Sequence, residues 1–353
     1  MSPLNLCSRK PWLVRSSPHL SDGLSSSSTL RQMAPVIVCN DPCRPYCKKV
    51  LFMTKSLSVT RSERKECAKL MWEMGKIASS NGWIAILKDG AMHLRDTDLI
   101  TEPKRIPLPP LTTLPHCQTQ VVTNVAMSST FPEEEDCVVA VKFLGPQLSF
   151  CRPNNSKEEW INVRIENPSF FSSPIIFSKK HGVFLTPGAG GHVIASWDHH
   201  NPLPKLQTLR FQNLPKLSKT KRDILDSCST SEHLVESKPT GEMFMVKLYR
   251  KFASFMFGTA ANLRTEALMV FKLDDEGNAV YTQDIGDLCI YLTRSEPFCL
   301  PSSFSPTLCR PNRVKIFDID EDKFFKLSDQ KWNCSRQTPL ESFDCSSGTW
   351  SWV

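Results

Sequence analysis

From residue 83 onward, apolar residues fall in short runs divided by turn residues, a pattern typical of β-strands. Asp89-Gly90, Gly145-Pro146 and His181-Gly182 each join two such runs. Glycine tolerates the positive φ that a tight turn between antiparallel strands needs, so these dipeptides predict hairpins. Strands or hairpins are predicted at residues 83–94, 137–151, 158–163, 174–185, 190–198, 232–249, 268–283, 287–292 and 312–320.

The predicted hairpins recur at intervals of roughly 40–50 residues, the spacing of four-stranded propeller blades. One hairpin alone is marginally stable in water, whereas a ring of blades buries each sheet against its neighbours. Helices do not alternate with these strands, which argues against a doubly wound parallel sheet. The sequence therefore predicts an all-β fold over residues 81–330, a β-propeller of about five or six four-stranded blades. An irregular pair of β-sandwiches is the alternative.

The net charge of +7 is concentrated at the front of the chain. Residues 1–80 hold 13 Lys or Arg and five Asp or Glu, whereas the remaining 273 residues hold 30 and 31. A nucleic-acid-binding protein carries its basic residues on the folded part, so this distribution argues against nucleic acid as a partner. The chain also has no apolar run long enough to span a membrane.

Residues 1–35 are basic and rich in serine, with Asp22 as their single acidic residue. They lack the apolar core of a secretory signal and fit an organellar transit peptide. Their arginine content favours the mitochondrion, while the serine run at 25–28 keeps the chloroplast or dual targeting open. The cytosol and nucleus are less favoured, and a disordered tail of similar composition is the alternative interpretation of the segment.

Residues 36–59 are predicted to be a proline-rich linker. Cys39, Cys43 and Cys47 stand at intervals of four within it, and three thiolates could bind a metal. Pro42 and Pro45 prevent a helix from aligning them, so the linker interpretation is preferred. The 14 cysteines are scattered along the chain, which predicts reduced thiols, several of them buried, and no disulfide framework.

Residues 60–80 are predicted to form one helix. Thr60 and Glu63 have the spacing of a capping box, and apolar residues from Cys67 to Ala78 fall on one helical face. Gly82 then supplies the stop. At the other end of the chain, residues 331–353 are predicted to be a C-terminal tail.

Residues 201–231 interrupt the hairpin pattern and are predicted to form an inter-blade strand followed by an exposed basic loop. The basic residues are Lys205, Arg210, Lys216, Lys219, Lys221 and Arg222. A charge run of this kind is most often a solvated surface, and a docking patch for an acidic partner is the alternative.

Several residue groups were considered as sites of chemistry. The glycines of TPGAGGHV (186–193) could cradle a phosphate, but the motif lacks the Lys-Ser/Thr of a P-loop and a following helix, which favours a blade turn. His192, His199 and His200 with Asp198 could ligate a metal, but their position before Asn-Pro favours a polar loop. We therefore predict no catalytic, cofactor-binding or metal-binding residues and no cofactor.

Three acidic segments of the body are predicted to be exposed turns. Calcium binding requires carboxylates at alternate loop positions with a fixed glycine and a bidentate glutamate, and none of the three has this arrangement. The segments are residues 132–137, 274–276 and 318–322.

Three segments resemble a known family: residues 103–115, 267–283 and 284–301 (DIGDLCIYLTRSEPFCLP). They are similar to the plant F-box-associated family of unknown function whose domain is a KIB-type β-propeller. Two further segments, 133–153 and 222–237, most resemble its organellar branch, which is expanded in crucifers. The resemblance covers residues 80–325 and implies the propeller fold that the hairpin spacing predicts independently.

Many members of this family carry an N-terminal F-box, which links a substrate-binding propeller to a ubiquitin ligase. An F-box begins with a Leu-Pro-x-Glu-like sequence followed by several helices, whereas residues 1–59 here are rich in Ser, Pro and basic residues. This departure weakens a ligase-adaptor role and agrees with the organellar branch, whose members resemble former F-box proteins with a transit peptide in place of the F-box.

The sequence thus favours a non-enzymatic, organellar and monomeric β-propeller that binds an unknown protein or ligand through the loops of one face. A substrate receptor of an SCF-type ubiquitin ligase with a degenerate or lost F-box is the main alternative. An enzyme that uses the Cys or His groups, and a product without a selected role, are further alternatives.

Overall fold

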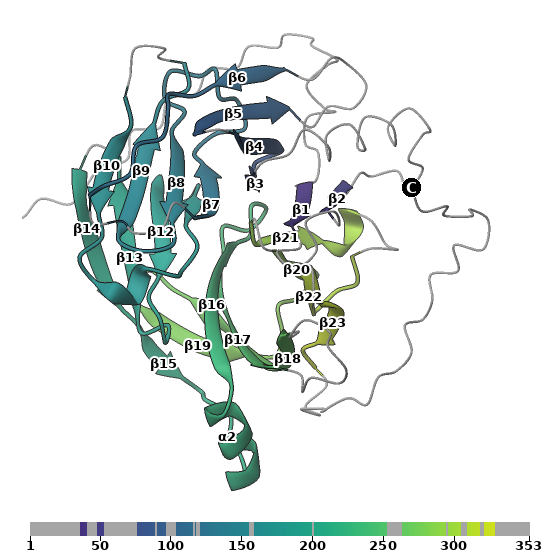
Figure 1. Cartoon of the computed structure of the whole chain (residues 1–353). Coiled ribbons are helices and arrows are strands. Elements are labelled where there is room, and N and C mark those ends of the chain that lie inside the picture. Colours follow the sequence, from purple (N-terminus) through teal and green to yellow (C-terminus); the bar gives the residue numbers. More distant parts are fainter. Residues whose placement is uncertain are drawn as a thin grey trace, which may run out of the picture. The chain divides into compact units, whose positions relative to one another are not determined.

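The computed structural model describes residues 36–40, 48–52, 76–88, 90–96, 104–115, 117, 121–154, 159–199, 201–252, 263–293, 296–304, 309–317 and 321–328. Five sheets of four or five strands follow one another along the chain as the blades of a β-propeller (Figure 1). Five blades agree with the predicted five or six.

The first three blades each contain four antiparallel strands in sequence order. Blade 1 comprises β3 (Lys76–Ser80), β4 (Trp83–Lys88), β5 (Ala91–Asp96) and β6 (Arg105–Pro107); blade 2 comprises β7 (Val122–Met127), β8 (Val139–Phe143), β9 (Gln147–Cys151) and β10 (Ile161–Arg164); blade 3 comprises β11 (Ile176–Ser178), β12 (Val183–Pro187), β13 (Val193–Asp198) and β14 (Asn201–Thr208). A short 3-10 helix, η1 (Pro168–Phe170), lies between blades 2 and 3.

Blades 4 and 5 depart from this simple order. Blade 4 comprises β16 (Ser229–Glu236), β17 (Met243–Phe252), β18 (Leu263–Leu273) and β19 (Asn278–Thr282), with β15 (Arg210–Gln212) added in parallel to β19. Blade 5 comprises β20 (Leu288–Thr293), β21 (Phe298–Pro301), β22 (Arg313–Phe317) and β23 (Asp322–Lys326), in the spatial order β21-β20-β22-β23, with η2 (Ser302–Phe304) after β21. The strands β3, β7, β11, β16 and β21 contact one another in succession and are the inner strands of the five blades.

Two boundary predictions are wrong where the structure describes them. The last residues of the predicted helix 60–80, Lys76–Ser80, form strand β3, and residues 60–75 lie outside the described residues. Within the predicted linker 36–59, β1 (Val36–Asn40) and β2 (Lys48–Phe52) pair as an antiparallel hairpin, and β1 lies beside β3. The linker prediction gave the prolines more weight than the apolar runs VIV and VLF, and the helix prediction extended a helical spacing into the strand KIASS.

The central strands of a blade serve two interfaces, as β8 shows. Val139, Val141 and Phe143 pack in the core shared with blade 1, whereas Ala140 packs in the core shared with blade 3. Successive side chains of a strand point to opposite faces, and in a propeller both faces meet a neighbouring blade. The apolar runs are therefore almost continuous, without the alternation of a sheet that has one face in water.

Four apolar clusters fill the junctions between blades 1 and 2, 2 and 3, 3 and 4, and 4 and 5. Toward the remaining junction, blade 5 buries Tyr291 and Phe298, while blade 1 buries Ile84 and Ile86. The seven described cysteines have free thiols and six of them are buried, as predicted; Cys228 is half-buried. Burial of each large apolar side chain contributes about 1.5–3 kcal/mol, so the junctions supply most of the stability.

The connection from blade 3 to blade 4 runs along the outer edges of both sheets. β14 is the outermost strand of blade 3, and β15 follows it directly and pairs with β19. Arg210 donates its backbone N–H to the Gly277 carbonyl at 2.8 Å, which joins the two blades at this edge. Only after the helix α2 (Lys219–Asp226) does the chain return to the inner strand β16.

The prediction for residues 201–231 is partly correct. The inter-blade strand is present as β14 and β15, but part of the predicted basic loop is the helix α2. Ser218 caps the helix by accepting a hydrogen bond from the Lys221 N–H through its side chain. Leu217 and Leu225 pack against the core between blades 3 and 4. The helix was not predicted because the many charged residues of the segment outweighed these two leucines, which pack against the core. Within the described chain, no helix is long and apolar enough to cross a membrane.

Gly191 permits the close packing of blade 3 on blade 4. It has a φ of 72°, and an added Cβ would lie 2.8 Å from Met245 Sδ and 3.3 Å from Glu232 Cγ. We expect Gly191→Ala to lower the free energy of unfolding by about 2–4 kcal/mol, because backbone strain and overpacking both contribute.

Gly190→Ala is the matched control, since Gly190 has a φ of 82° but its added Cβ would approach only His192, at 3.5 Å. Gly190→Ala should lower the free energy of unfolding by about 1 kcal/mol. If urea denaturation gives the same decrease in the free energy of unfolding for both variants, backbone strain accounts for the effect and overpacking does not.

Lys142 is a fully buried lysine in blade 2. Its ammonium donates to the carbonyls of Phe143, Gly145 and Phe171, and burial lowers the pKa of Lys142 from 10.5 to about 7. In the unfolded chain the lysine stays protonated to higher pH, so folding releases a proton between these two values and stability rises with pH there.

We therefore expect the stability of the wild type, relative to Lys142→Met, to increase from pH 7 to 9 by up to about 1.4 kcal/mol per pH unit. Comparing the two proteins removes the contribution of the buried thiols, which both contain. Urea denaturation at each pH measures the difference. A difference that stays constant with pH would mean that Lys142 remains protonated in the folded state.

Candidate interaction face

The turns beside the inner strands bring polar side chains from different blades together. We call them the inner turns. They comprise residues 81–82 in blade 1, 128–138 in blade 2, 179–182 in blade 3, 237–242 in blade 4 and 296–297 in blade 5. Each is fixed by the strand on either side of it, so its side chains have defined positions.

Asn81 connects blade 1 to three other blades. Its Nδ2 donates to the Met127 carbonyl of blade 2 at 2.7 Å, and its Oδ1 accepts from Lys238 Nζ of blade 4 at 2.9 Å. Its backbone N–H donates to Glu296 Oε2 of blade 5 at 3.1 Å. Asn81 has a φ of 49°, a left-handed conformation that asparagine tolerates better than most residues. One turn residue therefore ties the first blade to the last.

The carboxylate of Glu296 lies in a poorly solvated position at this junction. Burial raises the pKa of Glu296, while the Lys238 ammonium and the Asn81 N–H act in the opposite direction. Burial thus disfavours the charged form of Glu296 at the junction between blades 5 and 1, and its two partners favour that form.

Glu236 performs a similar role between blades 3, 4 and 5. Its Oε1 accepts the backbone N–H of Lys180 at 3.1 Å, and its carbonyl accepts the Cys299 thiol at 3.4 Å. Its Oε2 is buried and has no hydrogen-bond partner among the described residues. A buried carboxylate oxygen without a donor is costly, so a donor that reached Oε2 would stabilise this end of β16.

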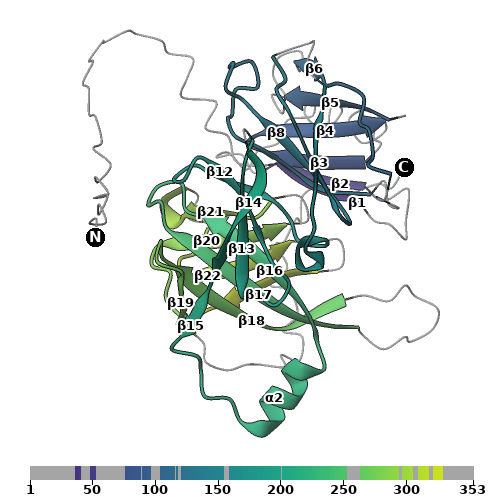
Figure 2. The same ribbon diagram turned by 90° about the vertical axis from the view of Figure 1, so that its left-hand side faces the viewer.

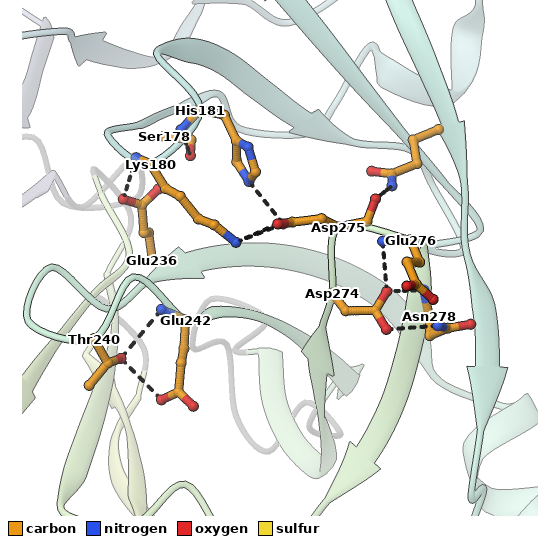
Figure 3. Close-up of polar contacts among 11 residues, drawn as sticks. Ser178, Lys180, His181, Glu236, Thr240, Glu242, Asp274, Asp275, Glu276 and Asn278 are labelled. Atoms are coloured by element: carbon orange, nitrogen blue, oxygen red, sulfur yellow. Dashed lines mark hydrogen bonds and ion pairs between the residues drawn. The ribbon is translucent and has the colours of Figure 1, made fainter. Parts of the chain in front are cut away.

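Exposed charges surround this network (Figure 3). Lys180 Nζ lies 2.7 Å from Asp275 Oδ1, and His181 Nε2 lies 3.5 Å from the same oxygen. Lys180 and His181 come from the blade 3 turn and Asp275 from the β18–β19 turn of blade 4. The side chains of Lys180 and Asp275 are 43% and 62% exposed, so the pair contributes little to stability but sets where both charges stand.

The turns of blade 4 are also internally ordered. A hydrogen bond from Lys272 lowers the pKa of Glu242, and Glu242 also accepts from the Thr240 hydroxyl at 3.0 Å. Asp274 accepts from both the side chain and the backbone N–H of Asn278, which lowers the pKa of Asp274. Figure 3 shows the contacts of Glu242 with Thr240 and of Asp274 with Asn278.

The inner turn of blade 2, residues 128–138, is long and acidic. Trp83 Nε1 of blade 1 donates to the Thr130 carbonyl at 2.9 Å and anchors it. Glu134 accepts from the Ser129 hydroxyl, and Phe131 is 42% exposed. The predicted acidic turn at 132–137 is therefore confirmed as an exposed and ordered loop.

The arrangement is suited to binding. Its charges are mixed in sign, exposed and positioned by hydrogen bonds between blades, which reduces the entropy lost on contact with a partner. Across the described residues, no group of three or more His, Cys, Asp or Glu is arranged to hold a metal ion. Ser231 Oγ lies 3.1 Å from His233 Nε2, but the two are neighbours on one face of β16, so strand geometry accounts for their contact.

Of the candidate metal ligands, the structure brings His199 and Asp198 together and places His192 in a different environment. His192 packs edge-on against the Phe211 ring, with centroids 5.1 Å apart. His199 lies 3.5 Å from Asp198 through Nδ1 and 3.2 Å from Arg152 through Nε2. His200, Cys43 and Cys47 lie outside the described residues, as does the side chain of Cys39.

The glycine-rich segment and the acidic segment 274–276 adopt the predicted turns, whereas residues 318–320 lie outside the described residues and Asp322 begins β23. TPGAGGHV forms the turn between β12 and β13, with Gly190 and Gly191 at positive φ. Residues 274–277 form the β18–β19 turn, in which the Asp274 carboxylate accepts backbone N–H groups from Glu276 and Asn278. Of the segment 318–322, Glu321 accepts hydrogen bonds from the N–H and hydroxyl of Thr265.

Sequence analysis missed the residues that organise the inner turns. Asn81-Gly82 follows β3 directly, and Asn-Gly between apolar runs is a strong hairpin signal. It was hidden because Gly82 was assigned as the end of a helix. Lys180, Lys238 and Glu296 gave no signal, because their contacts join blades that are far apart in the sequence.

Residues 55–335 match the model of the KIB1-4 β-propeller family. No curated protein sequence matches the chain. Two structures of Hsv2 from Kluyveromyces lactis are similar in fold: one with a complete loop 6CD has 11% sequence identity and a TM-score of 0.27, and the other has 10% and 0.25. Each similarity covers 59% of this chain and 71% of the Hsv2 chain.

Asn81→Gly tests whether the Asn81 side chain holds the ring together. Glycine keeps the left-handed backbone but loses the side-chain bonds to Met127 and Lys238, so we expect the free energy of unfolding to fall by about 1–3 kcal/mol. Asn213→Gly is the control, because Asn213 has a similar φ of 55° and is exposed. It should change stability by less than about 0.5 kcal/mol. If urea denaturation gives the same result for both, the Asn81 amide does not stabilise the junction.

Proposed function

Because the chain belongs to the KIB1-4 β-propeller family, we propose that it is a non-enzymatic interaction module that works inside an organelle and binds a protein partner on its inner turns. The mitochondrion is the first candidate compartment and the chloroplast the second. The process it serves is left open by this proposal.

The observation that carries the proposal is the exposed network around Lys180 and Asp275. It combines side chains from separate blades, and hydrogen bonds fix the turns from which they project. Interfaces are strengthened by groups that are already in place before contact. Binding is further supported by the Oε2 atom of Glu236, which is buried beside this network without a donor among the described residues.

The organellar part of the proposal is supported by the leader. Residues 1–35 contain basic residues and serines with a single acid, which is the composition of a transit peptide. Residues 81–353 hold 30 basic and 31 acidic residues, so the positive charge of the leader and of residues 36–80 does not continue into the rest of the chain.

A charge swap tests the binding face directly. Lys180→Asp combined with Asp275→Lys keeps the ion pair but reverses the pattern a partner would meet. With the tagged full chain expressed in plant cells and purified from isolated mitochondria, we expect at least a 10-fold loss of the partner recovered with the wild type. Such a loss corresponds to about 1.4 kcal/mol. The control swap Arg164→Glu with Glu166→Arg reverses another exposed pair and should leave recovery unchanged.

Two results would contradict the proposal. Absence of the full chain from mitochondria and plastids alike would remove the organellar role. Co-purification of the Skp-type adaptor of a ubiquitin ligase, with the partner unaffected by the swap at Lys180 and Asp275, would favour the alternative of a substrate receptor with a degenerate F-box.

A further inference from the structure

A second surface lies on the outer edges of blades 3 and 4. It begins beside the β18–β19 turn, where Gln207 donates to the Asp275 carbonyl, and continues from there to α2. We call residues 203–224 the rim strip. It includes most of β14, all of β15 and the first part of α2, which projects beyond the blades (Figures 1 and 2). Six of its residues are Lys or Arg, and Asp223 is its single acidic residue.

The basic side chains of the rim strip are mostly unused by the fold. Arg210 donates to Asn278 and to the Glu276 carbonyl, and so has a structural role. Among described residues, the other five basic side chains form no ion pair; they are Lys205, Lys216, Lys219, Lys221 and Arg222. Their positive charge is therefore available to a partner.

The charges of α2 also oppose the stability of the helix. The first turn contains Lys219, Lys221 and Arg222 and no acid, and the last turn contains no basic residue. Because the N-terminus of a helix is partially positive, acids are favoured there and bases at the other end. α2 has the reverse arrangement, so its charges do not serve the helix itself.

Exposed apolar side chains accompany this charge. Of the ten large apolar residues that are exposed in the described chain, four lie in the rim strip: Leu203 (74%), Leu206 (58%), Leu214 (57%) and Ile224 (43%). Leu217 and Leu225, by contrast, pack into the core and hold the strip in place. Basic and apolar groups thus alternate on a surface that is fixed to the blades.

From these contacts we infer that the rim strip is a second docking surface, which binds an acidic segment of a protein partner that also carries apolar side chains. Acidic groups would meet Lys216, Lys219 and Lys221, and apolar groups would cover Leu206 and Leu214. Pro202 and Pro204 lack N–H groups, which protects this part of the β14 edge from strand addition. The partner is therefore held by side chains.

Two other classes of partner fit the strip less well. Nucleic acid would use the positive charge but leave the leucines exposed, and Phe211, the only aromatic residue of the strip, packs against Phe271 with centroids 4.8 Å apart and cannot stack on a base. A membrane surface requires a broad apolar helix face, whereas α2 keeps Leu225 in the core and exposes Ile224.

The test uses the full chain and a fluorescent 12-residue peptide that repeats Asp-Glu-Leu. We expect Lys216→Glu with Lys219→Glu and Lys221→Glu to weaken its binding at least 10-fold by fluorescence anisotropy. The triple variant should unfold no earlier than the wild type, because it places acids in the first turn of α2. The control variant, Arg164→Glu with Arg310→Glu and Lys326→Glu, changes three exposed basic residues elsewhere and should bind within 2-fold of the wild type.

The apolar contribution is tested separately. Leu206→Ser with Leu214→Ser, and a peptide that repeats Asp-Glu-Ser, should each weaken binding at least 3-fold. The inference is overturned if the triple variant binds like the control, if the serine peptide binds as tightly as the leucine peptide, or if duplex DNA or phosphatidylserine vesicles bind more tightly than the peptide. The swap at Lys180 and Asp275 should leave peptide binding unchanged, so failure at one surface is distinguishable from failure at the other.

Discussion

Each blade of this protein must bury both faces against its neighbours. β17 illustrates the constraint, because Met243 and Met245 pack toward blade 3 while Phe244 and Val246 pack toward blade 5. A blade removed from the ring would expose an apolar layer on each side. The blades are therefore stable together or not at all, and every interruption of the strands has to leave these layers intact. Two residues meet special needs of this packing. Gly191 allows a close approach of two blades because it has no side chain, and Lys142 donates hydrogen bonds to carbonyls at a turn.

Polar contacts take part in closing the ring, in addition to the apolar side chains of blades 1 and 5. Asn81, Lys238 and Glu296 come from the first, fourth and fifth blades and meet in hydrogen bonds. These bonds lie in turns, so they are close to solvent, and their groups are also part of the surface that a partner meets. Binding at the inner turns and stability of the ring are thus linked, because a ligand that reorganises Lys238 would alter the junction of blades 5 and 1.

Features that depend on residues close together in the sequence were easier to predict than features that depend on distant residues. Hairpins with local turn chemistry, such as those at Gly90 and Gly277, were predicted correctly because two adjacent runs and one glycine specify them. The class of fold followed from their spacing and from the family resemblance. The site could not be predicted in the same way, since the contact of Lys180 with Asp275 spans 95 positions and depends on how two blades pack. The errors at Lys76–Ser80 and at α2 arose where a charged or helical pattern covered a few decisive apolar residues.

Some residues of a propeller are constrained by packing, whereas others can vary and serve binding. A strand residue in a blade is constrained on both faces, so its identity is explained by packing, as for Ala140 or Val246. Turns and the edge connection between blades 3 and 4 are released from that constraint, and their composition needs another cause. In the inner turns that cause includes closure of the ring, which requires groups such as Asn81. In the rim strip neither packing nor helix stability accounts for the basic residues at the start of α2, and their arrangement fits the inferred docking of an acidic partner.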